Sequence, residues 1–599
     1  MLSFKLSQNT LARRNNSTSA LARHSIRGRS LADEQRGEAR KQVLPVENMQ
    51  SDRQDFIAAG KSVEQTEVTC TSFSQFVTRP ASFRHLKLIR CNELTKAGYL
   101  EDLVTAFEDR DCKITSLDLS CNNFGAAGGA LASMIRPQKL LRKLTLSWTN
   151  LCGYRNARNV AALAPALSEL RSLESLDITF NELGPKSMVT LAPSLQCLTG
   201  LRELSLNCNE LGDRGVSELS RVLPYMRDLR VLDLGLNDMG GDGVKSLACA
   251  LTSLQRLECL RIVSSDLTSS TSVEALVSAL RNLPHLSVLN LGSCAIGHNG
   301  LKALIPAMEA LPELMDLDLS YNQLGESASK WIPAVISSLP KLKTLNLSHN
   351  NLGNSTTLQN LVLALKAAPH LHSLGLQCCG LNHYDMNAVA LALDSLDGLE
   401  TLDISCNYEI ADWRPLGSVL AGRSKLTELR MSHIGINDDN SSHLFPALAA
   451  LPSLQKLYLS GNAIGAVGSE ILSSSLAAVS GLYELDVSHN PLGEVGIVNL
   501  SSSIQHQWKL KSLDLGYSGM ADIGAKHLAK VVPGFPELKQ LRLGGNDMST
   551  VGALHLIPSL MACPQLEEVL CTDTGDKAGK LLETALRIHR RHCTCLPPN

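Results

Sequence analysis

Apolar and polar residues follow two different periods along most of this chain of 599 residues. In the stretch from Glu203 to Gly212, written ELSLNCNELG, leucine alternates with polar residues. Alternation with a period of two places Leu204 and Leu206 on the same face of an extended segment. This stretch therefore predicts a short strand with one apolar face.

The next stretch, from Asp213 to Leu229, changes to the spacing of an amphipathic helix. Val216, Leu219 and Leu223 recur every three or four residues and form one stripe along such a helix. Pro224 then disfavours further helix, because proline lacks the backbone N–H donor and clashes with the preceding turn. The pattern predicts a strand and a helix joined by tight connections.

The same pairing of a strand pattern with a helix pattern recurs along the chain as 18 units. Eleven of the 17 intervals between successive units are 28 residues long, and only the intervals of 31 and 32 near the start fall outside 27 to 29. Such regularity is the sequence signature of a repeat architecture. Each unit contains a Leu-x-Leu core, whose first residues are Leu86, Leu117, Leu144, Leu176, Leu204, Leu232, Leu260, Leu289, Leu317, Leu345, Leu374, Leu402, Leu429, Leu457, Leu485, Leu513, Leu541 and, in a degenerate last copy, Val569.

A single unit of one strand and one helix cannot bury both of its apolar faces. Stacked units can, because neighbouring strands form a sheet and neighbouring helices form a layer that covers one face of it. The sequence therefore predicts an α/β solenoid of about 18 repeats with a parallel sheet and a layer of helices.

A polar residue recurs five positions after the first leucine of each core, and we call this the ladder position. An asparagine amide can both donate to and accept from backbone groups, so we expect it to satisfy buried polar atoms between repeats. Where the residue bonds more weakly or is apolar, near units 260–289 and 374–434, we expect local irregularity. Ten units carry asparagine: Asn122, Asn181, Asn209, Asn237, Asn322, Asn350, Asn407, Asn462, Asn490 and Asn546. The others carry Cys91, Thr149, Ser265, Cys294, Cys379, Ile434, Ser518 and Thr574.

The composite pattern LxxLxLxxNxLG followed by a helix is similar to the leucine-rich repeats of the ribonuclease-inhibitor class, also used by NOD-like receptors and Ran GTPase-activating proteins. The resemblance extends from about Phe83 to Asp576. It implies a right-handed horseshoe with strands on its inner face and helices outside. It also implies that the surface of this horseshoe binds a protein.

The two ends of the chain differ from the repeats. Residues 1–42 are rich in serine and arginine, and no acidic residue precedes Asp33. This composition predicts a disordered tail, although residues 1–32 also resemble a mitochondrial presequence or the secretion signal of a bacterial type III effector. We expect residues 43–82 to cap the N-terminal end of the core, and residues 577–599, a basic amphipathic helix, to cap the C-terminal end.

Composition narrows the range of partners. The chain has 56 basic and 58 acidic residues and a pI near 6.8, which favours no nucleic-acid partner. No apolar run reaches the ~18 residues of a membrane-spanning helix. The 17 cysteines are scattered without paired spacing and no signal-peptide pattern precedes them, so we interpret them as reduced, mostly buried thiols of a cytoplasmic protein. We expect a monomer without a cofactor.

Three short motifs resemble catalytic or metal sites but lack the required spacing. Gly60-Lys61-Ser62 ends like a phosphate-binding loop, but Asp55 stands where the first glycine is needed. In Gly516–Met520, GYSGM, the last glycine is one position early for a nucleophile elbow, and Ser518 is a ladder residue. The C-terminal cluster lacks the usual gap between its cysteines, so we predict neither a catalytic residue nor a metal site; it comprises His589, His592, Cys593 and Cys595.

Two repeated positions are candidates for partner binding. The residue between the two leucines of each core projects onto the inner face, where aspartate is common, and Asp318, Asp486 and Asp514 are candidates for contact with a basic partner. Arginines such as Arg430 and Arg542 interrupt this row. We therefore favour a mixed-charge surface over an acidic one.

The second candidate is the position just before the ladder residue, which we call the rim. Large amphipathic side chains at an exposed rim are common anchors of protein interfaces. Only 4% of the chain is aromatic, yet the rim carries rings in seven units. Gly461 and Gly545 at the same position leave open that it accepts any residue. The ring-bearing rim residues are Trp148, Phe180, Tyr321, His349, His433, His489 and Tyr517.

These observations favour a non-enzymatic protein that binds an unidentified partner protein on its inner face and rim, as a regulator or inhibitor. A bacterial effector that binds a host protein with the same surface is an alternative, since only its destination differs. A GTPase-activating protein of the Ran-regulator type is a third, although those carry an acidic tail and this chain ends with Arg587, Arg590 and Arg591.

Overall fold

The computed structural model describes residues 84–91, 97–109, 112–152, 157–353, 355–408, 410, 412–572 and 576–589. All of them belong to one unit, Thr66–Asn599. The expected tail (1–42) and N-terminal cap (43–82), the Gly60-Lys61-Ser62 motif and the end of the C-terminal cluster (592–595) lie outside the described residues. The tail and the cap therefore stay predictions.

The described residues form one sheet of 18 parallel strands. Each strand pairs with the strands of the preceding and following repeats, so the spatial order equals the chain order. The strands are β1 (His85–Lys87), β2 (Ser116–Asp118), β3 (Lys143–Thr145), β4 (Ser175–Asp177), β5 (Glu203–Ser205), β6 (Val231–Asp233), β7 (Cys259–Arg261), β8 (Val288–Asn290), β9 (Asp316–Asp318), β10 (Thr344–Asn346), β11 (Ser373–Gly375), β12 (Thr401–Asp403), β13 (Glu428–Arg430), β14 (Lys456–Tyr458), β15 (Glu484–Asp486), β16 (Ser512–Asp514), β17 (Gln540–Arg542) and β18 (Glu568–Leu570).

The helices follow the strands one repeat at a time. Where helical spacing predicts a helix in 213–229, the structure has α8 and then a 3-10 turn that contains Pro224. The helices are α4 (Ala97–Glu108), α5 (Gly128–Ile135), α6 (Arg158–Ser168), α7 (Gly184–Leu195), α8 (Gly212–Val222), η6 (Leu223–Tyr225), α9 (Gly241–Leu251), α10 (Ser270–Leu280), α11 (Gly297–Met308), α12 (Glu326–Ser329), α13 (Ile332–Ser337), α14 (Ser355–Lys366), α15 (Met386–Leu393), α16 (Arg414–Leu420), η7 (Ser441–His443), α17 (Phe445–Leu448), α18 (Ala466–Leu476), α19 (Gly493–Ile504), α20 (Asp522–Val531), η8 (Val532–Gly534), α21 (Thr550–Met561) and α22 (Asp576–His589).

The register of the sheet aligns the leucines of all repeats. Leu317 pairs with Leu289 on one side and with Leu345 on the other. Leu317 and the following Leu319 and Leu324 are buried between the sheet and the helices. This column of leucines is one continuous core, as the repeat pattern predicts.

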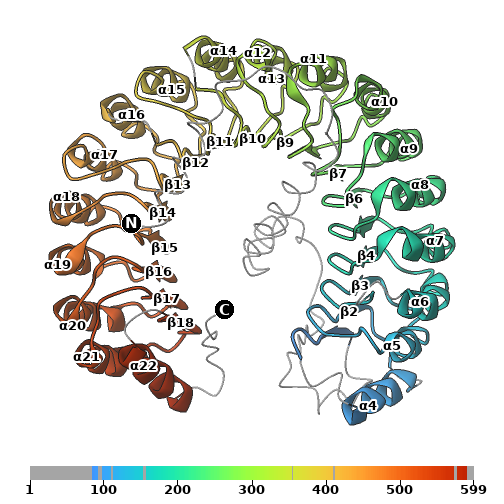
Figure 1. The fold of residues 1–599 in the computed structure, drawn as a ribbon, viewed down its shortest axis with the longest axis horizontal. Helices are drawn as coiled ribbons and strands as arrows, with labels where there is room; N and C mark the ends of the chain where they lie inside the picture. The colour runs from blue at the N-terminus through green and yellow to red at the C-terminus, as the bar shows by residue number, and fades with distance from the viewer. Residues whose placement is uncertain are drawn as a thin grey trace, which may run out of the picture. The chain divides into compact units, whose positions relative to one another are not determined.

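The repeats curve because their two layers have different spacings. Parallel strands lie about 4.8 Å apart, whereas packed helices need about 8–10 Å between their axes. Stacking both layers in step therefore bends the solenoid, with the strands on the inner side and the helices on the outer side (Figure 1). Among the residues that the structure describes, the sheet stays open and no helix covers its inner face (Figure 1).

The ladder asparagines bridge neighbouring repeats as expected. The Asn322 Oδ1 atom accepts hydrogen bonds from the backbone N–H groups of Cys294 (3.0 Å) and Ile296 (3.2 Å) in the preceding repeat. Its Nδ2 atom donates to the carbonyl oxygens of Leu291 (2.8 Å) and Ser320 (3.0 Å). One fully buried amide thus satisfies four backbone groups at a turn.

The substitutes at the ladder position replace part of this network. Thr149, Ser265 and Ser518 donate from their hydroxyls to the carbonyl three residues earlier, at 2.7, 2.6 and 2.5 Å. The thiols of Cys294 and Cys379 donate to a carbonyl of the preceding repeat, and burial raises the pKa of both to about 12. These two cysteines are structural donors, as the sequence indicates.

Cys91 departs from the expectation that the thiols are reduced. It takes part in a disulfide whose partner lies outside the described residues. The expectation of reduced thiols is therefore wrong for this residue.

The expected irregularity is only partly where the ladder predicts it. The units at 260 and 289 are regular, with α10 and α11 at 11 and 12 residues, so that expectation is wrong there. Within the units 374–434 the expectation is confirmed, since α16 has seven residues and the next repeat has only the short η7 and α17. A further interruption, between α12 and α13, lies outside the predicted units. A proline stands at the start of α13, α16 and α17, but one also stands at the start of the 12-residue α7, so a proline at this position does not by itself set the helix length.

Candidate protein-binding surface

The rim position has the same unusual backbone in repeat after repeat. Its residues have φ between +51° and +67°, in the left-handed region, from Cys121 to Gly545. The conformation is held by hydrogen bonds between repeats: the Tyr321 N–H donates to the Ser348 carbonyl (3.0 Å), and the His349 N–H to the Gln377 carbonyl (2.7 Å). The rim side chains therefore leave the backbone in the same direction in successive repeats.

The predicted rim rings form stacked pairs between neighbouring repeats. The ring centroids of Trp148 and Phe180 lie 4.0 Å apart with the planes at 16°. Those of Tyr321 and His349 lie 3.7 Å apart at 10°, and those of His489 and Tyr517 lie 4.4 Å apart at 12°. Trp148, Tyr321 and Tyr517 remain 36%, 39% and 48% exposed, so each pair presents ring surface to the solvent.

The two rim glycines take part in this arrangement. A Cβ atom at Gly461 would lie 2.0 Å from the ring of His433, and one at Gly545 would lie 2.2 Å from the ring of Tyr517. Each glycine thus accommodates the ring of the preceding repeat. The alternative that the rim accepts any residue does not describe these two positions.

The rings form separate patches rather than one continuous row. Between Phe180 and Tyr321 the rim carries small or aliphatic residues, namely Cys208, Leu236, Ser264 and Ser293. One patch therefore consists of Trp148 and Phe180, and a second begins at Tyr321 and His349. A third group runs from His433 to Gly545 and includes the stacked pair His489 and Tyr517.

The inner-face aspartates are turn residues in the structure. In each, Oδ1 accepts a hydrogen bond from the backbone N–H two residues later, at 2.8 to 3.0 Å, which closes the turn after the strand. Asp318 and Asp514 use Oδ2 for neighbours on the sheet, Asn290 (3.3 Å) and Arg542 (3.5 Å). Partner contact by these carboxylates stays a prediction. The turn-forming residues are Asp118, Asp177, Asp233, Asp318, Asp403, Asp486 and Asp514.

The charges on the inner face are mixed and partly neutralised. Arg430 pairs with Glu428 at 2.5 Å and lies 4.3 Å from the ring centre of Tyr458 on the next strand. Burial raises the pKa of Asp514, and the neighbouring Asp486 carboxylate raises it further. Burial likewise raises the pKa of Asp233, because the charged form loses solvation there. The interruption of the aspartate row by arginines agrees with a mixed-charge surface.

Of the motifs that resemble catalytic sites, the one around Ser518 lies within the described residues and has a structural role. The Ser518 side chain is buried in the ladder and its hydroxyl donates to Leu515, so it is not placed as a nucleophile. Within the described residues, no group of three or more His, Cys, Asp or Glu side chains could hold a metal ion. In that same part of the chain, no helix is long and apolar enough to cross a membrane.

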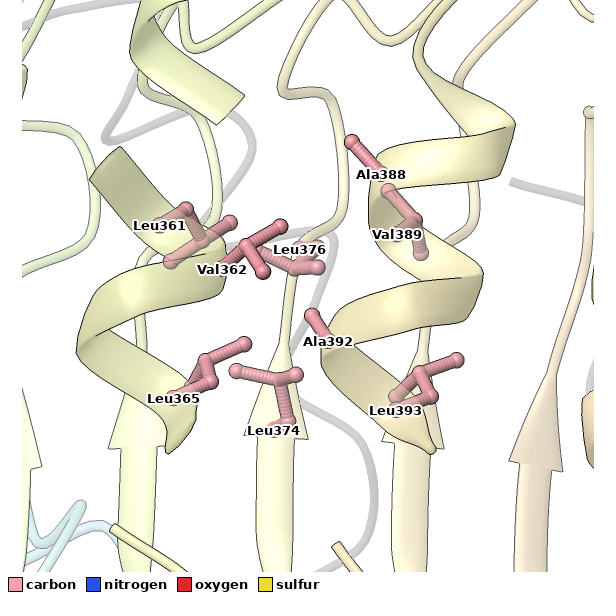
Figure 2. A pocket seen from close by; sticks show the side chains of 9 residues that line it. All are labelled: Leu361, Val362, Leu365, Leu374, Leu376, Ala388, Val389, Ala392 and Leu393. Atoms are coloured by element: carbon pink, nitrogen blue, oxygen red, sulfur yellow. The ribbon is translucent and has the colours of Figure 1, made fainter. Parts of the chain in front are cut away.

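An apolar crevice lies on the outer layer between α14 and α15, above β11 (Figure 2). None of its lining side chains is polar and could orient a ligand, so we interpret the crevice as loose packing between the two helices. Its lining residues are Leu361, Val362, Leu365, Leu374, Leu376, Ala388, Val389, Ala392 and Leu393.

Comparisons with known proteins concern the repeats. The model of the family described as "Leucine Rich repeat" matches residues 110–131, 169–192, 198–220, 225–248, 282–304, 338–355 and 450–470. A similar solved structure is an internalin of Listeria monocytogenes, with 18% identity, 63% of this chain and 88% of that chain covered, and a TM-score of 0.39. Another is a TLR13–ssRNA13 complex, with 17% identity, 81% and 73% covered, and a TM-score of 0.43. No curated protein sequence matches the chain.

Proposed function

The chain belongs to the leucine-rich repeat proteins, and from this membership we propose that it is a non-enzymatic binding protein that holds a partner protein against its inner face and rim. Within the family we assign it to the ribonuclease-inhibitor class. The 28-residue period and the helix in each described repeat support that assignment. Regulation or inhibition of the partner would follow from covering its surface.

One observation carries this proposal: large rings occupy an exposed position whose backbone is left-handed. That conformation costs a residue other than glycine about 1 kcal/mol or more. The rings do not enter the leucine core, and Trp148, Tyr321 and Tyr517 stay more than one-third exposed. Exposed aromatic surface that adds little to the core is typical of binding sites.

The arrangement also indicates what kind of partner fits. Each ring pair is already ordered before binding, so little side-chain entropy is lost when a partner packs against it. Tyr321 Oη lies 2.8 Å from His349 Nε2, which fixes polar atoms beside the apolar ring faces. Apolar anchors on the rim beside a mixed-charge inner face fit a folded protein better than a polyanion, in line with the net charge of −2.

The test compares two triple variants for their affinity for the purified partner. The partner is first isolated with the wild-type chain, and its dissociation constant is then measured by calorimetry. Trp148→Ala/Tyr321→Ala/Tyr517→Ala should weaken binding about 100-fold or more, because buried aromatic anchors dominate interface energies. The control, Tyr225→Ala/Leu391→Ala/Trp508→Ala, removes side chains of 52%, 59% and 53% exposure outside the sheet and should bind like the wild type. Undiminished binding by the rim variant would refute the rim as the interface.

The proposal places the protein in the cytoplasm, and a deletion tests this. Removal of residues 1–32 should leave its distribution unchanged. A redistribution would instead support one of the two targeting interpretations of that segment, import into mitochondria or secretion into a host cell.

A further inference from the structure

Two cysteines occupy the rim position in the neighbouring repeats of β11 and β12. Cys378 and Cys406 each lie three residues after a strand, and these strands pair in parallel with Gly375 opposite Asp403. Both have a left-handed backbone, with φ of 51° and 60°. Their thiols are half-buried and hydrogen-bonded to each other. The rim thus places two thiols in contact across adjacent repeats.

The surroundings make the two thiols unequal. Gln377 Nε2 donates to Cys406 Sγ at 3.8 Å. The hydrogen bond from Cys378, followed by those from Gln377 and Tyr408 and by the charge of His433, lowers the pKa of Cys406 to about 6. The same hydrogen bond and burial raise the pKa of Cys378. The surroundings therefore favour the thiolate form of Cys406 and the protonated form of Cys378.

We propose that Cys406 and Cys378 form a redox-reactive dithiol on the rim, in which Cys406 is oxidised by hydroperoxides and Cys378 then closes a disulfide between the two repeats. This inference does not depend on the proposed function.

The chemistry balances with hydrogen peroxide as the oxidant. The Cys406 thiolate attacks one peroxide oxygen, the O–O bond breaks, and Cys406 becomes a sulfenic acid while hydroxide leaves and takes up a proton. Cys378 then loses its proton and attacks the Cys406 sulfur, so that an S–S bond forms, the S–O bond breaks and a second water leaves. Two thiols are oxidised to one disulfide, and one peroxide is reduced to two waters.

The geometry permits the second step. Adjacent parallel strands lie about 4.8 Å apart, and a disulfide requires Cα atoms roughly 4.4–6.8 Å apart. The buried ladder cysteine Cys379 lies next to Cys378 in the sequence, but burial raises the pKa of its thiol to about 12. Cys379 is therefore a poor nucleophile, and the reactive pair is confined to the rim.

The first experiment measures alkylation of the full chain by iodoacetamide, residue by residue, between pH 5 and 9. Cys197 and Cys249, which are exposed, are the internal controls. At pH 6 Cys406 should react about tenfold faster than the controls, since its larger thiolate fraction outweighs the lower nucleophilicity of an acidic thiol. Its rate should reach half of its plateau near pH 6. An equal rate at pH 6 for Cys406 and the controls would overturn the proposal.

The second experiment treats the chain with hydrogen peroxide and maps the products by mass spectrometry. The wild type should form the Cys378–Cys406 disulfide, and a thiol reductant should reverse it. Cys378→Ser should accumulate a sulfenic acid at Cys406, which a cyclic 1,3-diketone traps, whereas Cys406→Ser should leave Cys378 reduced. Serine preserves side-chain size, and thermal unfolding of both variants checks that the repeats still fold. Failure of the wild type to form this disulfide, or an equal yield of sulfenic acid at Cys197, would contradict the assignment.

Discussion

The ladder and the rim are adjacent positions in every repeat, yet they differ in almost every physical respect. Asn322 is fully buried, and its amide satisfies four backbone groups. Tyr321, one residue earlier, is 39% exposed and stacks on His349 of the next repeat. The ladder side chain makes hydrogen bonds that hold the turn together, whereas the rim side chain makes none of them and projects from the turn.

This difference explains why the ladder position carries mostly asparagine, whereas the rim position carries many residue types. The backbone at the rim is fixed by hydrogen bonds such as that from the Tyr321 N–H to the Ser348 carbonyl, which do not involve the side chain. The side chain at the rim can therefore vary without changing the turn, except at Gly461 and Gly545, where the ring of the preceding repeat takes up the space. A solenoid can thus vary its binding surface while its core stays constant.

Removal of a ladder side chain should have the largest effect on stability. Asn322→Ala leaves the N–H groups of Cys294 and Ile296 without their acceptor in a buried turn, so we expect a loss of about 3 kcal/mol in the free energy of unfolding. Urea unfolding followed by circular dichroism measures this loss. The amide protons of Cys294 and Ile296 should also exchange faster with solvent.

The matched control is the neighbouring rim residue. Tyr321→Ala removes a larger side chain but no buried hydrogen bond of the turn, and we expect a cost of about 1 kcal/mol or less, mainly from the lost stacking. If the two variants were equally unstable, the distinction between ladder and rim would be wrong.

The sequence predicted the fold closely because the same pattern of apolar and polar residues recurs many times along the chain. Leu317, Leu319 and Leu324 are core residues and Asn322 is a ladder residue, as the pattern indicates. Of the interruptions of the outer layer, those at α16 and at η7–α17 fall in the predicted units 374–434, whereas the one at α12–α13 was not predicted.

The candidate surface was predicted as a set of residues but not as an arrangement. Nothing in the chain says that Tyr321 and His349, 28 residues apart, lie with their rings 3.7 Å apart. The glycines at 461 and 545 were a signal of a left-handed backbone, although they also fitted a position that accepts any residue. Stacking of the rings depends on the register between neighbouring strands, and this register cannot be read directly from a single sequence.

A Cβ atom introduced at a rim glycine should have the second largest effect on the free energy of unfolding. Gly545→Ala imposes a side chain on a residue with φ of +66° and pushes it into the Tyr517 ring, whereas Gly212→Ala has a similar φ of +57° with nothing within 4 Å. Both should cost about 1 kcal/mol for the left-handed conformation. Gly545→Ala should cost about 1 kcal/mol more, because the ring must move and its stacking on His489 is disturbed.

A double-mutant cycle isolates this second contribution. In a Tyr517→Ala background, Gly545→Ala and Gly212→Ala should cost the same in thermal unfolding, since no ring remains to be displaced. A difference that persists without the ring would show that Gly545 serves another purpose than to accommodate Tyr517.

The smallest effect on stability is expected on the inner face, where a charge can be removed while the hydrogen bond that closes the turn is kept. Asp233 accepts the Gly235 N–H at 3.0 Å, and asparagine makes the same bond at Asn290 and Asn346, at 2.9 and 3.1 Å. Burial raises the pKa of Asp233, so the folded chain binds a proton there more readily than the unfolded chain. This residue therefore contributes most to stability at low pH, and that contribution is lost as the pH rises from about 3.8 through the raised folded pKa. Asp233→Asn should accordingly be as stable as the wild type at acidic pH and more stable, by less than about 1 kcal/mol, at pH 7. A melting-temperature difference that shrinks as the pH rises would contradict a buried, poorly solvated carboxylate at this position.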